Sequence, residues 1–416
     1  MNGSILNNLL RENPIVVTGM GCFGAAGDNA DALWAAAMAG QSSAAWREFE
    51  MEVQRGRFAV CSAGGLDRWQ AELHPVHKLD RCVQMAWLAA NQAWKQARFT
   101  EAYPPARTGI MVGSSRGPLG KRSESFGLTG RQKFPPSLSA NSTFACIAGA
   151  LAQPFKLRGP GAAISATCAS AAFAIGLAAE QILLGKADAM IVGGTEAPLN
   201  FAVLAQLQSS GVLGFHEDAR QTCRPFDVTR NGIVLGEGSA FLILESARTA
   251  SARGAAALAR LAGWAGCLDD SGRVGVHKDG SGLLQVMECA LQVAGLGARQ
   301  IDYINAHGTG TKINDQAEAC AIKKLFGERT AMVPCSSTKP ITGHCLGATP
   351  ALEAVLCIEV LRRQQVPPTA NCLQPDPLCP INAQPLTTPS APLTHIMSNS
   401  LGFWGYHAAL IFSKSQ

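Results

Sequence analysis

The chain has 416 residues, of which 47% are hydrophobic and 16% are charged, a balance that fits a large buried core and excludes a disordered chain. Its formal net charge of +5 and its 6% of aromatic residues indicate neither a nucleic-acid partner nor a base-stacking surface. No stretch approaches ~18 uninterrupted apolar residues and no signal-peptide pattern opens the chain, so we expect a cytoplasmic protein without a membrane partner.

Short apolar runs that end in glycine or another small residue predict buried strands. In chain order, the first series is Ile15–Gly21, Gly109–Ser115, Ala162–Cys168, Met190–Glu196 and Ala240–Glu245. A second series follows with Ala257–Trp264, Tyr303–Gly308, Val333–Thr338, Ile396–Gly402 and Ala408–Phe412. Helices are predicted between them at Asp80–Ala97, Ala169–Leu184, Leu283–Ala294 and Asp315–Leu325. Such alternation of strands and helices predicts a layered α/β fold.

The two series have similar numbers of strands, which predicts two similar α/β halves that meet near residues 250–257. We assign residues 1–256 to an N-terminal domain and residues 257–416 to a C-terminal domain. No low-complexity linker separates the halves, so we expect them to share one core. The proline-rich stretch Val366–Pro392 is predicted to be a surface excursion before the last strands.

One glycine pattern resembles a nucleotide-binding motif. Gly19, Gly21 and Gly24 follow a predicted strand with the GxGxxG spacing of a dinucleotide site. The nearest acidic residues, Glu48 and Glu50, do not follow a predicted buried strand, as the residue that binds the ribose would. We therefore favour a tight turn between strand and helix over a nicotinamide site.

Fourteen cysteines are scattered without a CxxC pair, so neither a zinc ribbon nor a thioredoxin-type site is supported. Cys168 stands apart because it ends a predicted strand and directly precedes a long apolar helix whose first turn consists of small residues. There the helix dipole and free backbone N–H groups would lower the thiol pKa and favour the nucleophilic thiolate. The alternative for Cys168 is a small buried core residue, which we expect most of the other cysteines to be.

Two other predicted strand ends carry groups suited to chemistry. His307 opens a glycine-hydroxyl loop whose Thr309 and Thr311 could hold a ligand. Lys339 and His344 follow the next strand, just before a helix that contains Glu353, and groups so close in sequence can tune one another's charge. The alternatives are a structural histidine in the first segment and a surface lysine with a capping histidine in the second.

A fourth segment, residues 398–407, places Phe403 and Trp404 between two glycines. This pattern suggests a loop held close to a ligand, although an ordinary strand connection would explain the segment alone. Taken together, four strand ends carry a cysteine, histidines, a lysine and a phenylalanine. Ligands of α/β sheets bind at such carboxyl ends, so we expect one site there.

Together with longer motifs, these residues make the chain resemble the elongating, Cys-His-His group of β-ketoacyl-acyl-carrier-protein synthases. The resemblance extends along almost the whole chain. The motifs that carry the resemblance are TCASA at 167–171, NAHGTGTKINDQAE at 305–318, STKPITGHCLGA at 337–348 and SNSLGF at 398–403. LRGPG at 157–161, RPFDVTRNGIVLGEGS at 224–239 and VPPTANC at 366–372 agree as well. The resemblance implies a thiolase fold, with two similar α/β halves in a five-layered αβαβα core.

The resemblance also implies roles for the candidate residues. Cys168 would accept an acyl group as a thioester, with its own N–H and that of Phe403 as the oxyanion hole. His307 and His344 would then assist decarboxylation of a malonyl-carrier thioester, and Lys339 would tune both, with Glu353 as its partner. Further roles are bracing of the His307 loop by Asp315 and Glu318, binding of pantetheine by Thr309 and Thr311, and gating by Phe403.

Three features of the chain bear on which relative it resembles. A histidine at position 344 matches elongating synthases, whereas priming synthases carry asparagine and thiolases carry cysteine. Trp404, Tyr406 and His407 replace small residues of the family's GFGGTN loop, which should restrict the loop or reshape the pocket mouth. Arg116 aligns near the floor of the acyl pocket, where an unpaired charge beside an alkyl chain is costly. Arg116 must therefore turn outward, be paired, or serve a substrate that is not a plain alkyl chain.

The resemblance implies an acyl carrier protein as partner, attracted to basic residues for which Lys78, Arg81 and Lys133 are candidates. Their alternative is ordinary solvated surface. A homodimer is expected, and a heterodimer with a chain-length-factor-like subunit is possible. No metal or redox cofactor is expected, because the substrates are carried on the 4'-phosphopantetheine of the carrier.

Our main hypothesis is a type II condensing enzyme of fatty-acid or polyketide assembly, with Trp404 and Arg116 favouring specialised metabolism such as polyene or polyketide synthesis. A second hypothesis is an acyltransferase or malonyl decarboxylase that acylates Cys168 without condensing. A third is a non-catalytic pairing subunit that shapes a partner's pocket, which the presence of Cys168, His307 and Lys339 disfavours.

Overall fold

A computed structural model describes residues 3–51, 53–99, 103–127, 134–272, 276–384 and 387–415. Its helices are α1 (Gly3–Glu12), α2 (Ala30–Ala39), α3 (Arg81–Gln96), α4 (Leu119–Gly127), α5 (Leu138–Asn141), α6 (Ala145–Ala152), α7 (Ser170–Leu183), α8 (Phe201–Ser209), α9 (Ala247–Ala252), α10 (Ser281–Ala294), α11 (Lys312–Phe326), α12 (Lys339–Thr342) and α13 (Thr349–Arg363). Its strands are β1 (Ile15–Gly24), β2 (Ala45–Met51), β3 (Gln54–Cys61), β4 (Thr108–Gly113), β5 (Gly161–Ile164), β6 (Ala189–Glu196), β7 (Leu235–Gly236), β8 (Gly238–Ser246), β9 (Ala259–Leu268), β10 (Tyr303–Asn305), β11 (Cys335–Ser336), β12 (His395–Leu401) and β13 (Tyr406–Ser413).

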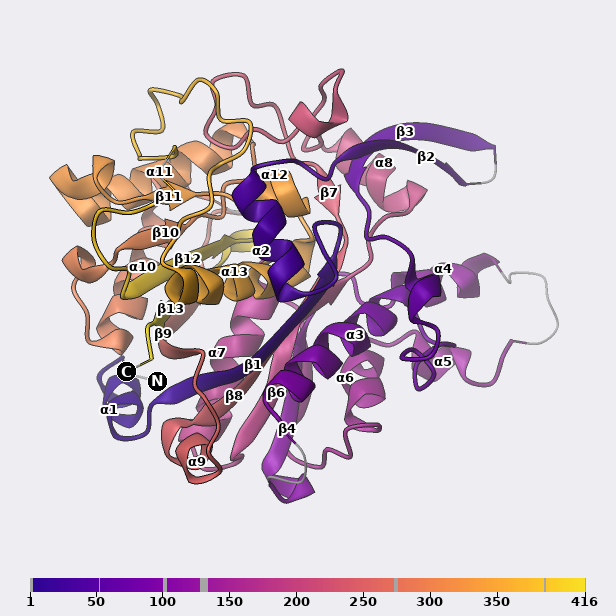
Figure 1. Cartoon of the computed structure of the whole chain (residues 1–416). Coiled ribbons are helices and arrows are strands. Elements are labelled where there is room, and N and C mark those ends of the chain that lie inside the picture. The colour runs from indigo at the N-terminus through magenta and orange to yellow at the C-terminus, as the bar shows by residue number, and fades with distance from the viewer. Residues whose placement is uncertain are drawn as a thin grey trace.

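The main sheet has ten strands and divides into two five-stranded halves (Figure 1). The first half has the order β5-β4-β6-β8-β1, and the second has the order β9-β13-β12-β10-β11. They are joined where residues 15–17 of β1 pair antiparallel with residues 259–261 of β9. Strands β4, β5 and β6 run parallel, as do β10, β11 and β12, so the carboxyl ends of each set share one edge.

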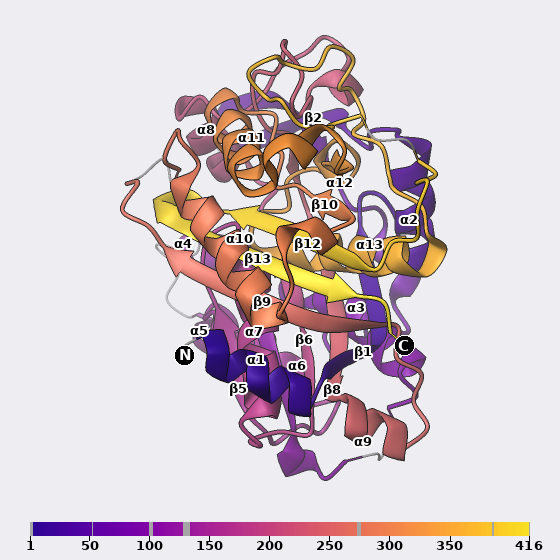
Figure 2. The same cartoon turned by 90° about the vertical axis from the view of Figure 1, so that its left-hand side faces the viewer.

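Helices fill the space between the halves and cover them on the outside (Figure 2). α7 and α13 contact strands of both halves and form the central layer. α3 and α6 cover the first half, whereas α10 packs on β9 and β13 with α11 beside it. The largest apolar cluster, rich in alanine, leucine and isoleucine, lies in the central layer. The order helix, sheet, helix, sheet, helix confirms the predicted five-layered thiolase fold.

The glycine pattern lies inside a strand, so the predicted tight turn is wrong. β1 runs unbroken from Ile15 to Gly24 and is almost wholly buried. A Cβ atom at Gly19 would lie 2.2 Å from the Ala93 carbonyl oxygen, and one at Gly21 would lie 2.3 Å from the Ala89 oxygen. These glycines therefore let α3 pack closely on the strand, and they form no nucleotide-binding loop.

Several elements, such as α2, α6 and α8, were not predicted from the sequence, and two further features also escaped prediction. The segment that contains Glu48 and Glu50 is itself a strand, β2, which forms a small second sheet with β3 and β7. Its residues alternate poorly because much of β2 is exposed on both faces. The other feature is α1, which buries Leu6 and Leu10 on one face despite the polar residues around them.

Candidate active site

The four candidate strand ends converge on one cavity of about 700 Å³. Cys168 reaches it from the segment between β5 and α7, and His307 from the loop after β10. His344 follows α12, and Phe403 follows β12. The structure thus brings together residues up to 235 positions apart, between Cys168 and Phe403. Lys339 is fully buried and is not among the residues that line the cavity.

Cys168 sits in a tight turn just before α7. Thr167 adopts a left-handed φ of 50°, and Cys168 is 8% exposed. The backbone N–H of Phe403 donates toward the Cys168 sulfur. The Thr167 hydroxyl donates to the Phe403 carbonyl oxygen at 3.3 Å, so the two segments hold each other directly.

The expectation of a lowered Cys168 pKa is wrong. Burial raises the pKa of this thiol to about 12, although the charges of Lys339 and Arg116 and the Phe403 N–H lower it by less. Two of the N–H groups at the start of α7 are already used, since Ala169 donates to Ala166 at 3.0 Å and Ser170 donates to Thr167 at 3.3 Å. Those donors point back along the chain, so they are not free to stabilise a thiolate. The resting cysteine is a neutral thiol.

The two histidines face each other edge to face, with ring centroids 5.4 Å apart. Burial lowers the pKa of both well below the usual value, and the charge of Lys339 lowers it further. Both imidazoles are therefore neutral near pH 7. His344 Nδ1 lies 3.1 Å from the Thr349 hydroxyl, which leaves its Nε2 directed elsewhere. His307 Nδ1 is buried without a hydrogen-bond partner among the described residues.

Lys339 forms a buried ion pair with Glu353, the partner expected from the sequence. Their Nζ and Oε1 atoms are 2.7 Å apart, and the two side chains are 0% and 2% exposed. Burial raises the pKa of Glu353 to about 7, and Lys339 opposes that rise. The pair places a fixed positive charge behind both histidines.

A set of buried carboxylates fixes the loop that carries His307. Glu318 accepts the backbone N–H groups of His307 at 2.8 Å and of Gly308 at 2.7 Å. Asp315 accepts those of Thr309 at 3.0 Å and of Gly310 at 3.2 Å. The two carboxylates expected to brace this loop therefore contact its backbone. The Thr309 and Thr311 hydroxyls lie 2.9 Å apart and both residues line the cavity.

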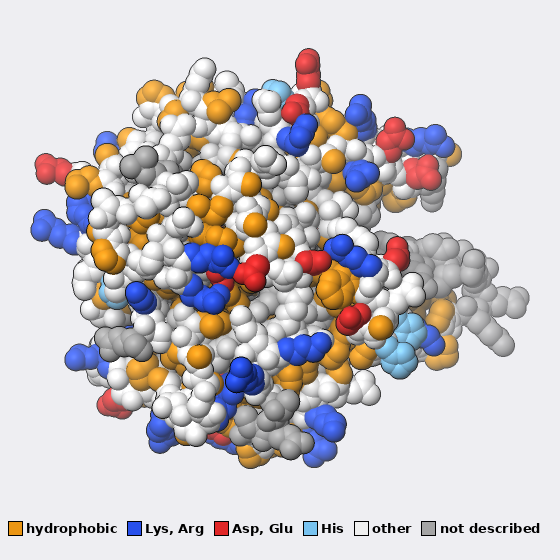
Figure 3. Space-filling model, viewed as in Figure 1, with side chains coloured by type: hydrophobic (Ala, Val, Ile, Leu, Met, Phe, Trp, Pro, Cys, Tyr) orange, Lys and Arg blue, Asp and Glu red, His pale blue; other side chains and the backbone are white. Residues whose placement is uncertain are grey.

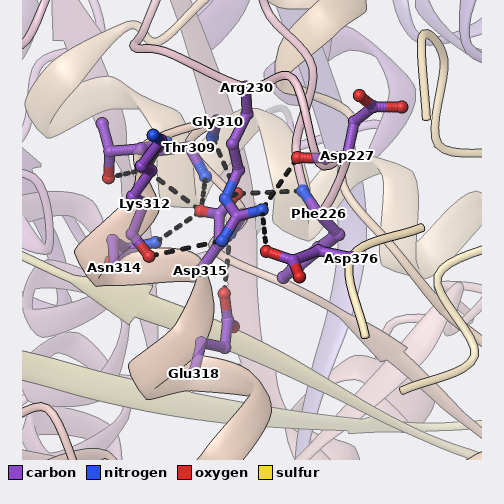
Figure 4. A network of polar contacts seen from close by, with 12 residues as sticks. Phe226, Asp227, Arg230, Thr309, Gly310, Lys312, Asn314, Asp315, Glu318 and Asp376 are labelled. Atoms are coloured by element: carbon purple, nitrogen blue, oxygen red, sulfur yellow. Dashed lines mark hydrogen bonds and ion pairs between the residues drawn. The ribbon is translucent and has the colours of Figure 1, made fainter. Parts of the chain in front are cut away.

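Sequence reasoning missed the buried Arg230, which ties this loop to two other segments (Figure 4). Its side chain is 1% exposed, and it lies 3.5 Å from Asp315 and 2.7 Å from Asp376. Asp376 belongs to the proline-rich stretch, whose Cys372 and Cys379 are also buried. The prediction that this stretch is a mere surface excursion is therefore wrong. The sequence signal for Arg230 is the RPFDVTRNG segment, which agrees with the family without indicating a role for this residue.

The segment after β12 forms a short turn whose Phe403 lines the cavity, whereas Trp404 is not among the lining residues. Phe403 is 39% exposed and Trp404 is 56% exposed. Trp404 has a left-handed φ of 62°, and Gly405 has a φ of 75°. A bulky residue therefore occupies a conformation that favours glycine, which indicates that neighbouring contacts impose it.

Arg116 is half-buried in the loop after β4. Its backbone N–H donates to Glu196 Oε1 at 2.9 Å, and the same carboxylate accepts the Gly347 N–H at 3.1 Å. No hydrogen bond or ion pair joins its guanidinium to another residue in the described part of the chain. Arg116 is thus only partly exposed, and its guanidinium has no partner among the residues that the structure describes.

The three candidate docking residues have different surroundings. Lys78 is exposed, whereas Arg81 donates to Glu237 at 2.7 Å and to the Ala63 carbonyl oxygen at 2.7 Å. Lys133 lies outside the described residues. On the face seen in Figure 3, basic and acidic side chains are interspersed. Within the described ranges, no helix is long and apolar enough to cross a membrane, and no three metal-ligating side chains gather.

Comparison with known proteins gives a consistent family. Residues 12–250 match the family described as beta-ketoacyl synthase, N-terminal domain, and residues 258–373 match its C-terminal domain. A 3-oxoacyl-[acyl-carrier-protein] synthase 2 of Staphylococcus aureus (strain COL) is 33% identical over 412 residues, 96% of this chain and 98% of the relative. Nodulation protein E of Rhizobium meliloti is 35% identical over 419 residues, 97% and 100% of the two chains.

Solved structures agree in fold. A beta-ketoacyl synthase from Burkholderia phymatum STM815 has a TM-score of 0.84 at 30% identity, covering 97% of this chain and 100% of that one. The ishigamide ketosynthase/chain length factor has a TM-score of 0.86 at 28% identity with the same coverage. The chain belongs to the β-ketoacyl synthase family, the condensing acyltransferases of the thiolase-fold superfamily.

Proposed function

We propose that this protein joins an acyl group held on Cys168 to a malonyl group held on an acyl carrier protein, with release of CO2. The observation that carries the proposal is the convergence of Cys168, the Phe403 N–H and two neutral histidines on one cavity. Each group has a separate task in such a reaction.

The first step transfers the acyl group. The Cys168 sulfur attacks the thioester carbonyl, and the oxygen that becomes negative is stabilised by the N–H groups of Cys168 and Phe403. The sulfur of the carrier arm then leaves, and the proton of the Cys168 thiol ends on that sulfur. Because the resting thiol is neutral, proton transfer must accompany the attack.

The second step uses the histidines. The carboxylate of the malonyl group leaves as CO2, and the electron pair of the broken C–C bond passes to the thioester oxygen. Neutral His307 and His344 each donate an N–H to this enolate oxygen, which an imidazole can do without carrying charge. The enolate carbon attacks the acyl-Cys168 carbonyl, and the Cys168 thiolate leaves and is reprotonated. Burial keeps both imidazoles neutral by lowering their pKa values, and the charge of Lys339 adds to this effect.

The carrier arm is proposed to enter past Thr309 and Thr311, which line the mouth of the cavity beside Lys312. Lys78 is the exposed docking candidate, and Lys133 stays a prediction. Arg81 can assist only in part, because Glu237 already binds its guanidinium. We propose no redox cofactor, since neither step transfers electrons to an acceptor. We propose no metal, since the backbone and imidazole N–H groups stabilise the negative oxygen in each step. A cytoplasmic location and the division at residues 256 and 257 also stay predictions.

The half-buried Arg116 bears on which kind of acyl chain the protein accepts. Cys168 packs in an apolar cluster with Phe58, Leu204 and Leu207, while the Arg116 charge acts on the same sulfur. Arg116 is not among the residues that line the cavity, but a nearby guanidinium without a partner among the described residues suits an acyl chain that carries a polar or unsaturated segment better than a plain alkyl chain. Structural neighbours described as the ishigamide ketosynthase/chain length factor and as a type II PKS ketosynthase bound to a hexaketide support a specialised pathway.

A dimer is proposed for this chain. Strand β5 lies at the edge of the ten-stranded sheet, so one side of it pairs with no other strand of the described residues. A second copy could extend the sheet there. A neighbour described as a ketosynthase in complex with its chain length factor supports a heterodimer as the alternative.

The test is intact-protein mass spectrometry with acyl carriers of varied chain length, followed by malonyl carrier. A β-ketoacyl carrier product that lengthens the acyl chain by two carbons is expected. Acylation without any such product would favour the acyltransferase or decarboxylase alternative. A protein that is never acylated alone, but co-purifies with an active ketosynthase, would favour the pairing subunit.

A further inference from the structure

The turn that presents the Phe403 N–H is held in an unfavourable backbone conformation. Trp404 lies in the left-handed region with φ 62° and ψ 24°. For a residue with a Cβ atom this region costs about 1–2 kcal/mol, so contacts elsewhere must stabilise the turn. The two ends of the turn supply one such contact, because the Gly402 N–H donates to the Tyr406 carbonyl oxygen at 2.7 Å.

A single residue outside the turn, Asp269, holds it at two points. The Asp269 backbone N–H donates to the Gly405 carbonyl oxygen at 2.9 Å. Its Oδ2 atom lies 2.7 Å from His407 Nε2, and its Oδ1 atom accepts the Ser271 backbone N–H at 2.9 Å. A Cβ atom at Gly405 would lie 2.3 Å from Asp269 Oδ1, so only glycine leaves room for this arrangement.

His407 is the fully buried end of this contact, at the second position of β13. Because a carboxylate only accepts, His407 Nε2 must carry the proton that it donates to Asp269. Burial lowers the pKa of His407, and Asp269 opposes this. Burial alone would raise the pKa of Asp269, but hydrogen bonds from Ser271 and His407 outweigh it and lower the pKa. The contact is therefore a hydrogen bond from a neutral imidazole to a charged carboxylate, which is stronger than a neutral one.

The side chains of Asp269 and His407 are closely packed against α10. Gly282, in the first turn of α10, lies against both partners. A Cβ atom there would come within 2.2 Å of Asp269 Oδ2 and 2.9 Å of His407 Cδ2. Gly282 lies in α10, Asp269 directly follows β9 and His407 lies in β13, and these three elements pack on one another. The pair therefore ties the turn to the second half of the fold.

We propose that Asp269 and His407 are positioning residues that keep the Phe403 N–H directed at the Cys168 sulfur. This inference rests on the proposed function, in which that N–H is an oxyanion donor. Phe403 lies between two fixed points: Gly402, which packs against Thr167, and Gly405, which Asp269 holds. Without the pair, the strained Trp404 backbone can relax, and the donor moves away from the sulfur.

The first test compares His407→Ala with His407→Gln, whose side-chain amide reaches the place of Nε2 and can still donate to Asp269. His395→Ala is the matched control, because His395 lies on the neighbouring strand β12 and binds Ser413, not the turn. Single-turnover acyl transfer to Cys168 should slow by about tenfold or more in His407→Ala, as for partial loss of an oxyanion donor, and recover in His407→Gln. Decarboxylation of malonyl carrier, which uses His307 and His344, should stay within about twofold. Equal loss of both reactions, or no loss of acyl transfer, would overturn the inference.

A second test does not depend on any activity. Hydrogen exchange of a peptide spanning residues 402–407 should be at least about tenfold faster in His407→Ala than in the unmodified protein or in His395→Ala. Unchanged exchange would overturn the positioning role whatever the protein catalyses. Faster exchange in a protein that proves unable to condense would refute the proposed function and leave the structural role of the pair standing.

Discussion

A single methyl group at Gly402 is expected to disable acyl transfer by moving the Phe403 N–H. Gly402 has a φ of −122°, which alanine adopts readily, so the effect of Gly402→Ala is purely steric. The new Cβ atom would lie 2.0 Å from the Thr167 hydroxyl oxygen. Because carbon and oxygen normally approach no closer than about 3.4 Å, the new Cβ atom and the Thr167 hydroxyl must move apart by about 1.4 Å, which separates the segments carrying Cys168 and Phe403.

Loss of one oxyanion donor slows acyl transfer by about 10²–10³-fold, which is about 3–4 kcal/mol. The assay is the single-turnover rate of Cys168 acylation, followed by mass spectrometry. The double variant Thr167→Ala with Gly402→Ala should recover most of the rate, because the other neighbours of the new Cβ atom lie at 3.2 Å. Gly149→Ala is the control, since its Cβ atom would meet nothing within 4 Å. An unaffected Gly402→Ala variant, or a double variant as slow as the single one, would refute this reasoning.

Three more predictions concern the buried ionisable groups. Lys339→Met should destabilise the fold by about 3–5 kcal/mol in chemical unfolding, because it leaves Glu353 buried without its partner, and adding Glu353→Leu should recover most of that loss. Alkylation of Cys168 should accelerate about tenfold per pH unit from pH 7 to 9 without a plateau, because burial raises its pKa to about 12; a plateau below pH 9 would contradict the buried thiol. Malonyl decarboxylation should stay flat from pH 8 to about 6, because His307 and His344 have lowered pKa values and stay neutral; a fall centred near pH 6.5 would show ordinary histidines.

The main strands and helices were predictable because their signals are local. Buried parallel strands are continuous apolar runs, and the helices that pack on them repeat apolar residues at helical spacing. The five-layered arrangement came from the family resemblance, and the structure confirms it. The short strand β2 escaped prediction because it is largely exposed, so its sequence has no apolar period.

The sequence was enough to predict which residues form the site, but not their charge states or their distant partners. Cys168, His307 and Lys339 stand at strand ends, and motif order was enough to single them out. Their charge states were not predictable, because burial depends on packing: the helix start favours a thiolate, yet the closed cavity raises the Cys168 pKa. Arg230 and Asp376 pair across 146 residues, a contact that no local pattern contains.

The central claim is that Cys168 carries the acyl group. The most direct measurement is peptide mapping by mass spectrometry after incubation with an acyl carrier substrate, for the unmodified protein, Cys168→Ala and Cys289→Ala. Cys289 is the control because it is exposed, so that adventitious acylation would reach it first. We predict acylation of the peptide containing Cys168 in the unmodified protein and in Cys289→Ala, and none in Cys168→Ala. Acylation that persists in Cys168→Ala would contradict the mechanism.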